Sequence, residues 1–120
     1  MAETIAGIAT ALSNSGIGII RVSGSESIEI VNNIFINKKG EHLLSSFSSH
    51  TIHYGFIEFD GEIIDEVMVS IMNAPNSFTK EDVVEINCHG GVYVTKAVLA
   101  LVLKNGATMA GLENLLNDLS

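Results

Sequence analysis

Residues 81–106 read EDVVEINCHGGVYVTKAVLALVLKNG, and the periodicity of this stretch changes in its middle. Polar and apolar residues alternate over 82–88, which predicts a strand because successive side chains of a strand point to opposite faces. Gly90-Gly91 ends the alternation, and a nearly apolar, buried helix is predicted over 92–104. Gly106 suits the C-terminal stop of that helix. A strand that leads directly into a helix therefore anchors the expected fold.

The preceding segment predicts a β-hairpin. Residues 51–59 are rich in β-branched and aromatic side chains, as strands are. Asp60-Gly61 follows, a pair typical of two-residue hairpin turns. Residues 62–72 then form the returning strand. Alternation is expected to place Ile63, Val67, Val69 and Ile71 on one face of this strand.

The N-terminal part predicts two further strands and a helix. Strands are expected over 4–10 and 17–22, with a turn at 13–16. A helix is predicted over 26–35, with Ser25 as its N-cap. Loops are expected at 37–50 and 73–80.

The order strand-strand-helix-strand-strand-strand-helix predicts an α+β domain, with a mixed β-sheet covered by two main helices. The 120 residues suffice for one compact domain and are too few for two ordinary ones. We assign residues 1–110 to this domain. Residues 111–120 form an atypical tail that could be one more short helix.

The composition is unusually poor in charge and is acidic. Hydrophobic residues make up 47% of the chain and charged residues 17%, so we expect some apolar surface that a partner or another part of the protein covers. The net charge is −8, from 14 acidic and 6 scattered basic residues. Tight RNA binding needs basic side chains to displace counterions, so this domain is not expected to bind RNA tightly by itself.

The chain has a single cysteine, Cys88, so no internal disulfide is possible. That cysteine usage indicates a reducing compartment, and we predict a cytoplasmic location. The first residues lack the pattern of a secretory signal peptide. The longest apolar run, 97–103, is too short to cross a bilayer, so no membrane association is expected.

Arg21 is the only arginine, and it lies near the end of an otherwise apolar strand. Alternation places it on the same face as Ile17 and Ile19. An unpaired charge there would be costly, so the guanidinium must find an acceptor. That acceptor could be a ligand carboxylate or heterocycle, or an Asp or Glu across the sheet in a structural ion pair. The residues alone leave both readings open.

Glu85 belongs to a polar row on the strand over 82–88. Period two puts Val83, Glu85, Asn87 and His89 on one face and Val84, Ile86 and Cys88 on the other. The row could be a solvated sheet face above an apolar inner face. It could also aim a carboxylate at a donor-rich ligand such as a pterin ring, which shows an amide N–H beside an amino group.

No catalytic residue or metal site is predicted. His89-Gly90-Gly91 places free backbone N–H groups at a helix start, where anions bind, but the G-x-x-x-x-G-K-[ST] pattern of a phosphate loop is absent. The four histidines have no metal-ligand spacing. Cys88 alternates inward and is expected to be a small core residue. A stand-alone enzyme is therefore not supported.

Three segments together resemble one family. Residues 15–24, SGIGIIRVSG, are similar to the G-x-G-I-I-R-V-S-G motif near the start of the bacterial tRNA modification GTPases of the TrmE/MnmE family. Residues 74–79, APNSFT, and 81–85, EDVVE, resemble its A-P-x-S-[FY]-T-x-E-D-V-[VL]-E motif, which His89-Gly90-Gly91 completes. The resemblance covers about the first 110 residues in order, and the motifs together are specific.

The resemblance implies the N-terminal domain of such a GTPase. In that family the domain forms a homodimer and binds a formylated tetrahydrofolate, 5-formyltetrahydrofolate, and its fold is similar to the folate-binding domain of the aminomethyltransferase type. The folate is the one-carbon donor for wobble-uridine (U34) modification of tRNA, carried out with an FAD-dependent partner protein. A separate G domain binds GTP with Mg²⁺ and K⁺. Arg21 and Glu85 fall on the family's folate-contacting Arg and Glu.

The chain departs from the family at its C-terminal end. Residues 111–120, GLENLLNDLS, do not match the family's P-G-E-F-T-x-R-A-F-L-N-G-K-x-D-L segment, so its folate-contacting lysine has no counterpart. We expect weaker folate binding for that reason. The helical domain and G domain are also absent, so we expect a truncated or altered protein that does not hydrolyse GTP. A structural protein-interaction module without ligand binding is the alternative.

Overall fold

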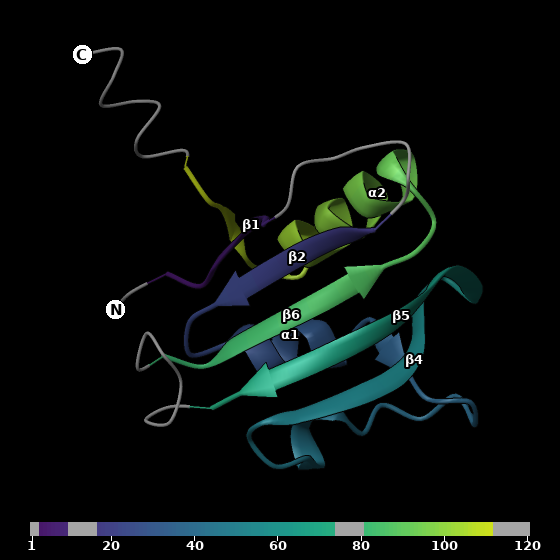
Figure 1. Ribbon diagram of the computed structural model, residues 1–120, viewed down its shortest axis with the longest axis horizontal. Coiled ribbons are helices and arrows are strands. Elements are labelled where there is room, and N and C mark those ends of the chain that lie inside the picture. Colours follow the sequence, from purple (N-terminus) through teal and green to yellow (C-terminus); the bar gives the residue numbers. More distant parts are fainter. Residues whose placement is uncertain (1–2, 10–16, 74–80, 112–120) are drawn as a thin grey trace.

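The computed structural model describes residues 3–9, 17–73 and 81–111, and its strands form one seven-stranded sheet (Figure 1). The elements are β1 (Ile5–Ile8), β2 (Gly18–Ser23), α1 (Ser27–Asn32), β3 (Phe35–Ile36), the 3₁₀ turn η1 (Leu44–Ser46), β4 (Thr51–Phe59), β5 (Glu62–Met72), β6 (Val83–Cys88), α2 (Val92–Lys104) and β7 (Thr108–Met109). The strand order is β3-β4-β5-β6-β2-β1-β7. Only the β1–β7 pair is parallel among the described strands. The predicted α+β class with a mixed sheet and two main helices is confirmed.

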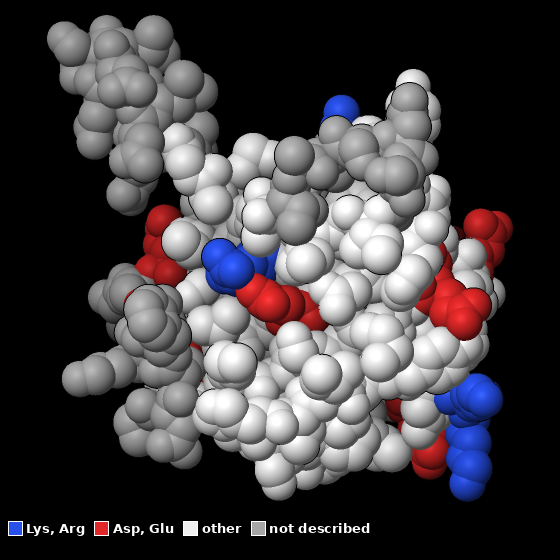
Figure 2. Space-filling view, in the orientation of Figure 1, with Lys and Arg blue, Asp and Glu red and all other residues white. Residues whose placement is uncertain are grey.

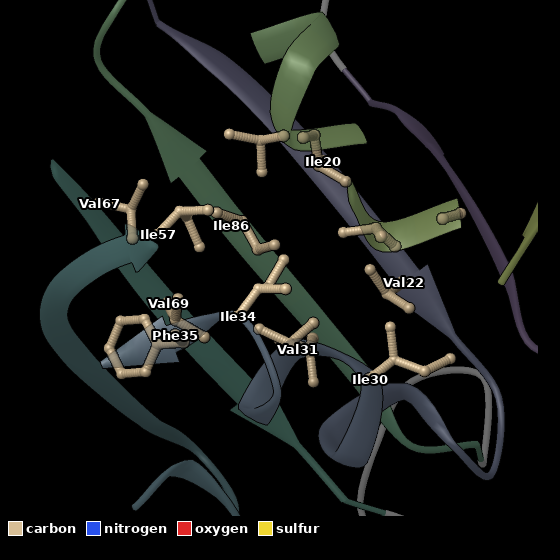
Figure 3. Packing of buried hydrophobic residues seen from close by; sticks show 14 of the residues in the cluster. Ile20, Val22, Ile30, Val31, Ile34, Phe35, Ile57, Val67, Val69 and Ile86 are labelled. Atoms are coloured by element: carbon tan, nitrogen blue, oxygen red, sulfur yellow. The ribbon is translucent and has the colours of Figure 1, made fainter. Parts of the chain in front are cut away.

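Both helices lie on the same face of the sheet, behind the strands in the view of Figure 1. The side chains between helices and sheet form one hydrophobic core, part of which Figure 3 shows. The inward positions of the central strands, such as Ile20, Val69 and Ile86, are fully buried. Each such side chain contributes about 1.5–3 kcal/mol through removal of its apolar surface from water. The other face of the sheet has no helix over it among the described residues.

The long hairpin has the predicted strand limits, but Ile63 does not share the face of the three residues predicted to lie beside it. Val67, Val69 and Ile71 are buried, whereas Ile63 is 55% exposed. The reason is a bulge: Ile57 pairs with Asp65 and Glu58 pairs with Ile63, so one extra residue on β5 shifts the alternation. Asp65 precedes the shift along the inward row of Val67, Val69 and Ile71, and it is buried with them.

The first helix is shorter than predicted and starts differently. It ends at Asn32 because Phe35–Ile36 pair with β4 as a short edge strand, which sequence patterning missed. Ser25 is not its N-cap. The structure places Glu26 there, and the Glu26 backbone N–H donates to the Thr4 Oγ1 at 3.1 Å. The helix therefore has no side-chain cap among the described residues, and Thr4, the residue before β1, holds its N-cap residue in place.

The second helix has the predicted limits but is not buried all round. Thr95, Val98, Leu99 and Val102 face the sheet, while Tyr93 is 88% exposed. Gly106 follows the C-cap with φ +122°, as expected of a helix stop. The chain then adds β7, which was not predicted, alongside β1.

Other predicted strands differ only at their ends, β1 beginning at Ile5, β2 running to Ser23 and β6 beginning at Val83. The expected loop over 37–50 contains the 3₁₀ turn η1. Three predictions lie outside the described residues: the turn at 13–16, the loop at 74–80 and the helix in the tail at 112–120.

Candidate functional site

Arg21 and Glu85 are direct cross-strand neighbours on β2 and β6. The Arg21 Nε donates to the Glu85 Oε2 at 2.8 Å, and the Arg21 Nη2 lies 2.7 Å from the same oxygen. The side chains are 56% and 32% exposed, on the face without helices. The ion pair across the sheet, one of the two readings of Arg21, is thus present. An ion pair this exposed to solvent adds only about 0–1 kcal/mol to stability. A contribution to folding therefore does not by itself explain the pair.

The contacts use only one oxygen of the carboxylate. Both Arg21 nitrogens bond to Oε2, and no described residue bonds to the Glu85 Oε1. Arg21 likewise keeps N–H donors beyond the two that face Glu85. The pair therefore presents an acceptor and donors side by side with no net charge. Such a group suits a neutral heterocycle better than a bare anion.

A cavity of about 230 Å³ opens beside Arg21. Its lining combines the guanidinium with apolar and main-chain surface from β1 and from the residue after β7: Ile5, Gly7, Ile8, Ala9, Arg21, Ser23 and Ala110. Ligand pockets for drug-sized molecules usually enclose about 300–1,000 Å³. The cavity is thus large enough for one ring system and leaves the rest of a larger ligand outside.

A second carboxylate stands at the same end of β6. The Ser23 hydroxyl, on the cavity wall, donates to the Glu81 Oε2 at 2.9 Å. In the sequence, Glu81 stands out only as the first residue of the EDVVE motif, with no predicted role. The sequence feature that could have pointed to Glu81 is its position in the motif, four residues before Glu85. Its contact with Ser23 could not be predicted, because it depends on the pairing of β2 with β6.

The exposed face around the pair is mostly uncharged. Figure 2 shows it as largely white, with a blue and a red patch in contact over β2 and β6. Several large apolar side chains on this face are more than 40% exposed: Ile5, Ile17, Ile52, Tyr54 and Met72. The Tyr54 hydroxyl donates to the Glu66 Oε2 at 2.6 Å, which raises the pKa of Tyr54. The apolar surface expected from the composition is present.

At the strand-to-helix junction His89-Gly90-Gly91, a buried carboxylate already binds two of the backbone N–H groups. The Asp65 Oδ2 accepts from the backbone N–H of His89 at 2.8 Å and of Gly90 at 3.4 Å. The Asp65 Oδ1 accepts from the Glu66 N–H at 2.9 Å. A buried carboxylate of the protein thus binds the N–H groups at the end of β6, while the first turn of α2 has no side-chain cap among the described residues. Asp65 faces inward by the same alternation as Val67, and the pairing of β5 with β6 brings it to His89.

Cys88 and the histidines have structural surroundings. Burial, and then the negative charge of Asp65, raises the pKa of the Cys88 thiol to about 12, so it is no thiolate nucleophile near neutral pH. His53 stacks on Phe47 with ring centroids 3.7 Å apart, and burial lowers its pKa. Over the described ranges, no three His, Cys, Asp or Glu side chains are grouped to hold a metal ion. None of the described helices has the length and apolar content of a membrane span.

Comparison with known proteins gives consistent matches. The family model described as GTP-binding protein TrmE N-terminus matches residues 4–112. Proteins named tRNA modification GTPase MnmE are 56% identical over 108 residues in Lachnoclostridium phytofermentans, 55% over 108 in Listeria welshimeri and 54% over 112 in Carboxydothermus hydrogenoformans. These alignments cover 90%, 90% and 92% of this chain and 24%, 23% and 24% of the relatives. The chain thus spans about a quarter of the length of these relatives.

Proposed function

The chain belongs to the family of TrmE N-terminal domains, and from this premise we propose that it binds a formylated tetrahydrofolate and joins two copies of a tRNA modification GTPase. The observation that carries the proposal is the Arg21–Glu85 pair beside a cavity on the face without helices. Arg21 and Glu85, the residues matched to the family's folate-contacting positions, are far apart in sequence. Their side chains meet on the open face of β2 and β6.

The pair has the chemistry that a pterin ring needs. The Glu85 Oε1, which no described residue bonds, is available to accept from the amide N–H and amino group of the ring. Arg21 keeps its partner oriented and donates from its remaining N–H groups to a carbonyl or ring nitrogen. The apolar cavity wall, with Ile5 and Ala9, covers the faces of a flat ring.

In the whole protein this domain would hold the one-carbon donor for U34 modification of tRNA, together with an FAD-dependent partner protein. GTP, Mg²⁺ and K⁺ would belong to the G domain. The net charge of −8 supports a role in which other parts of the protein contact the tRNA. The same proposal includes the likeness of the fold to the aminomethyltransferase type. It also includes the assignment of residues 1–110 to the domain and of 111–120 to a separate tail.

Dimerisation is supported by the apolar side chains on the open face. Ile52 is 65% exposed and Ile17 60% exposed, and neither is covered by a described helix. A second copy of the chain would remove this surface from water. We expect the protein to sediment as a dimer and Ile52→Glu to sediment as a monomer. A monomeric wild type at micromolar concentration would contradict dimerisation and leave the folate proposal intact.

Calorimetry with 5-formyltetrahydrofolate tests the ligand. Arg21→Ala and Glu85→Ala should each weaken binding by about 1–3 kcal/mol, as for lost charge-assisted hydrogen bonds. Glu66→Ala is the matched control, because Glu66 is another exposed carboxylate, hydrogen-bonded to Tyr54. Unchanged affinity in both site variants would contradict the assignment, and absence of binding by the wild type would contradict folate binding.

A further inference from the structure

The outer edge of β1 is only partly paired. The Ala9 N–H donates to the Ile19 O at 2.7 Å, so the odd-numbered residues of β1 form the hydrogen-bonded pairs with β2. The even-numbered residues point the other way, toward β7. Thr4 and Ala6 accept there from the N–H groups of Thr108 and Ala110, at 2.8 and 2.6 Å.

Ile8 is the next even-numbered residue, and β7 ends before reaching it. Its N–H and C=O point away from β2, and no described residue beyond the end of β7 bonds to them. Ile8 also lines the cavity beside Arg21. Within the described residues, the cavity therefore contains a length of strand edge whose main-chain donor and acceptor have no partner.

Gly7 keeps that edge accessible. A glycine weakens a strand and commonly marks a close approach. Gly18 and Gly55 have such a neighbour in the core, Thr95 and Phe35 respectively. Gly7 instead lines the cavity, and its φ is not in the left-handed region. A Cβ on Gly7 would stand 3.0 Å from the Ala110 Cβ, which also lines the cavity.

We propose that the free N–H of Ile8 is the element that recognises the one-carbon group of the ligand, by donating a hydrogen bond to its formyl carbonyl. The inference rests on the proposed function. A carboxylate such as Glu85 accepts only, so it takes the donor-rich end of the heterocycle and leaves the carbonyl-bearing end to a donor. From β6 to the outer edge of β1 is two strand spacings, on the order of 10 Å, the span of a fused two-ring system with its first substituent.

The test compares 5-formyltetrahydrofolate with 5-methyltetrahydrofolate, whose methyl group cannot accept a hydrogen bond. The wild type should bind the formyl compound about tenfold more tightly, the worth of roughly one hydrogen bond. Ile8→Pro removes the N–H without breaking a bond to β2, since proline is tolerated where a strand N–H faces outward. That variant should lose the preference.

Ile8→Ala is the matched control, because it removes the same core-packing side chain and keeps the N–H. It should retain the tenfold preference. A preference that survives in Ile8→Pro, or that is absent from a wild type that binds both compounds, overturns the inference and leaves folate binding intact. Binding of neither compound contradicts the proposed function, and the inference with it.

A measurement on the unmodified protein guards against misfolding of the proline variant. Saturation with the formyl compound should slow amide hydrogen exchange at Ile8 about tenfold or more, and the methyl compound should not. The Gly7 amide is the internal control, since it faces Arg21 on β2 in both states. Equal exchange at Ile8 with and without the formyl compound overturns the inference.

Discussion

The two faces of β6 carry opposite kinds of side chain. On the face toward the helices, Val84, Ile86 and Cys88 are fully buried. On the other face, Glu85 and Asn87 are half-buried, and Glu85 is paired with the only arginine. Residues adjacent in sequence on β6 thus have different roles, because they lie on opposite faces of the sheet. One face contributes most of the folding energy, and the other is free to carry a binding site at little cost in stability.

The contrast also explains the exposed apolar residues. A single sheet with both helices on one side has a second surface that no described element covers. Ile52 and Tyr54 remain exposed on it although the chain has enough apolar residues to fill a core. The exposed face is therefore available for a ligand and a second subunit.

The largest effect is expected on the covered face. Ile86→Ala should lower the free energy of unfolding by about 2–5 kcal/mol, because it leaves a cavity in a fully buried position. Urea denaturation measures it. Asn87→Ala, the next residue on the opposite face, is the control and should cost less than about 1 kcal/mol. Equal losses would break the distinction between the faces.

The second effect is expected at Asp65, a polar residue on the covered side. Asp65→Ala should lower the free energy of unfolding by about 1–3 kcal/mol, since the backbone N–H groups of Glu66, His89 and Gly90 lose their acceptor. Asp65→Asn keeps one acceptor oxygen and should lose less. Unchanged stability of the alanine variant in urea would show that water replaces the carboxylate without cost.

Cys88 should make stability depend on alkaline pH. Its pKa is raised to about 12 in the folded chain, against about 8.5 unfolded, because burial disfavours the thiolate. The stabilising contribution is therefore complete below about pH 8.5 and is lost as the pH rises toward 12. Between pH 8 and 10 the loss should be on the order of 1–2 kcal/mol. Cys88→Ala, measured in urea at both pH values, should lack that part of the decline; an equal decline would contradict the assignment.

The smallest effect on stability is expected at the ion pair. Arg21→Ala should change the free energy of unfolding by less than about 1 kcal/mol, because the pair is largely solvated. Ile20→Ala, one residue earlier on the covered face, should cost about 2–5 kcal/mol. A loss of more than about 2 kcal/mol for Arg21→Ala would make the pair a folding element and remove the main support for a binding role.

Much of the fold could be predicted because its strands and second helix have strong local periodicity. The strands of the long hairpin and α2 have the predicted limits. Predictions were wrong where a distant contact overrode a local preference. Glu26, whose N–H donates to Thr4, stands at the N-cap position expected of Ser25, and Phe35 pairs with β4 where the predicted helix would have continued. The bulge at Ile57 turned Ile63 outward.

The candidate site divides in the same way. The sequence by itself determined that Arg21 shares a face with Ile19 and that Glu85 shares a face with Asn87, because a strand alternates with period two regardless of what surrounds it. It also determined the family, since ordered motifs need no coordinates. Only the tertiary structure decided that the two side chains meet, that Asp65 binds the N–H groups of His89 and Gly90, and that no described residue pairs with the edge at Ile8. Each of these depends on strand register and on where a neighbouring strand stops, which long-range packing sets.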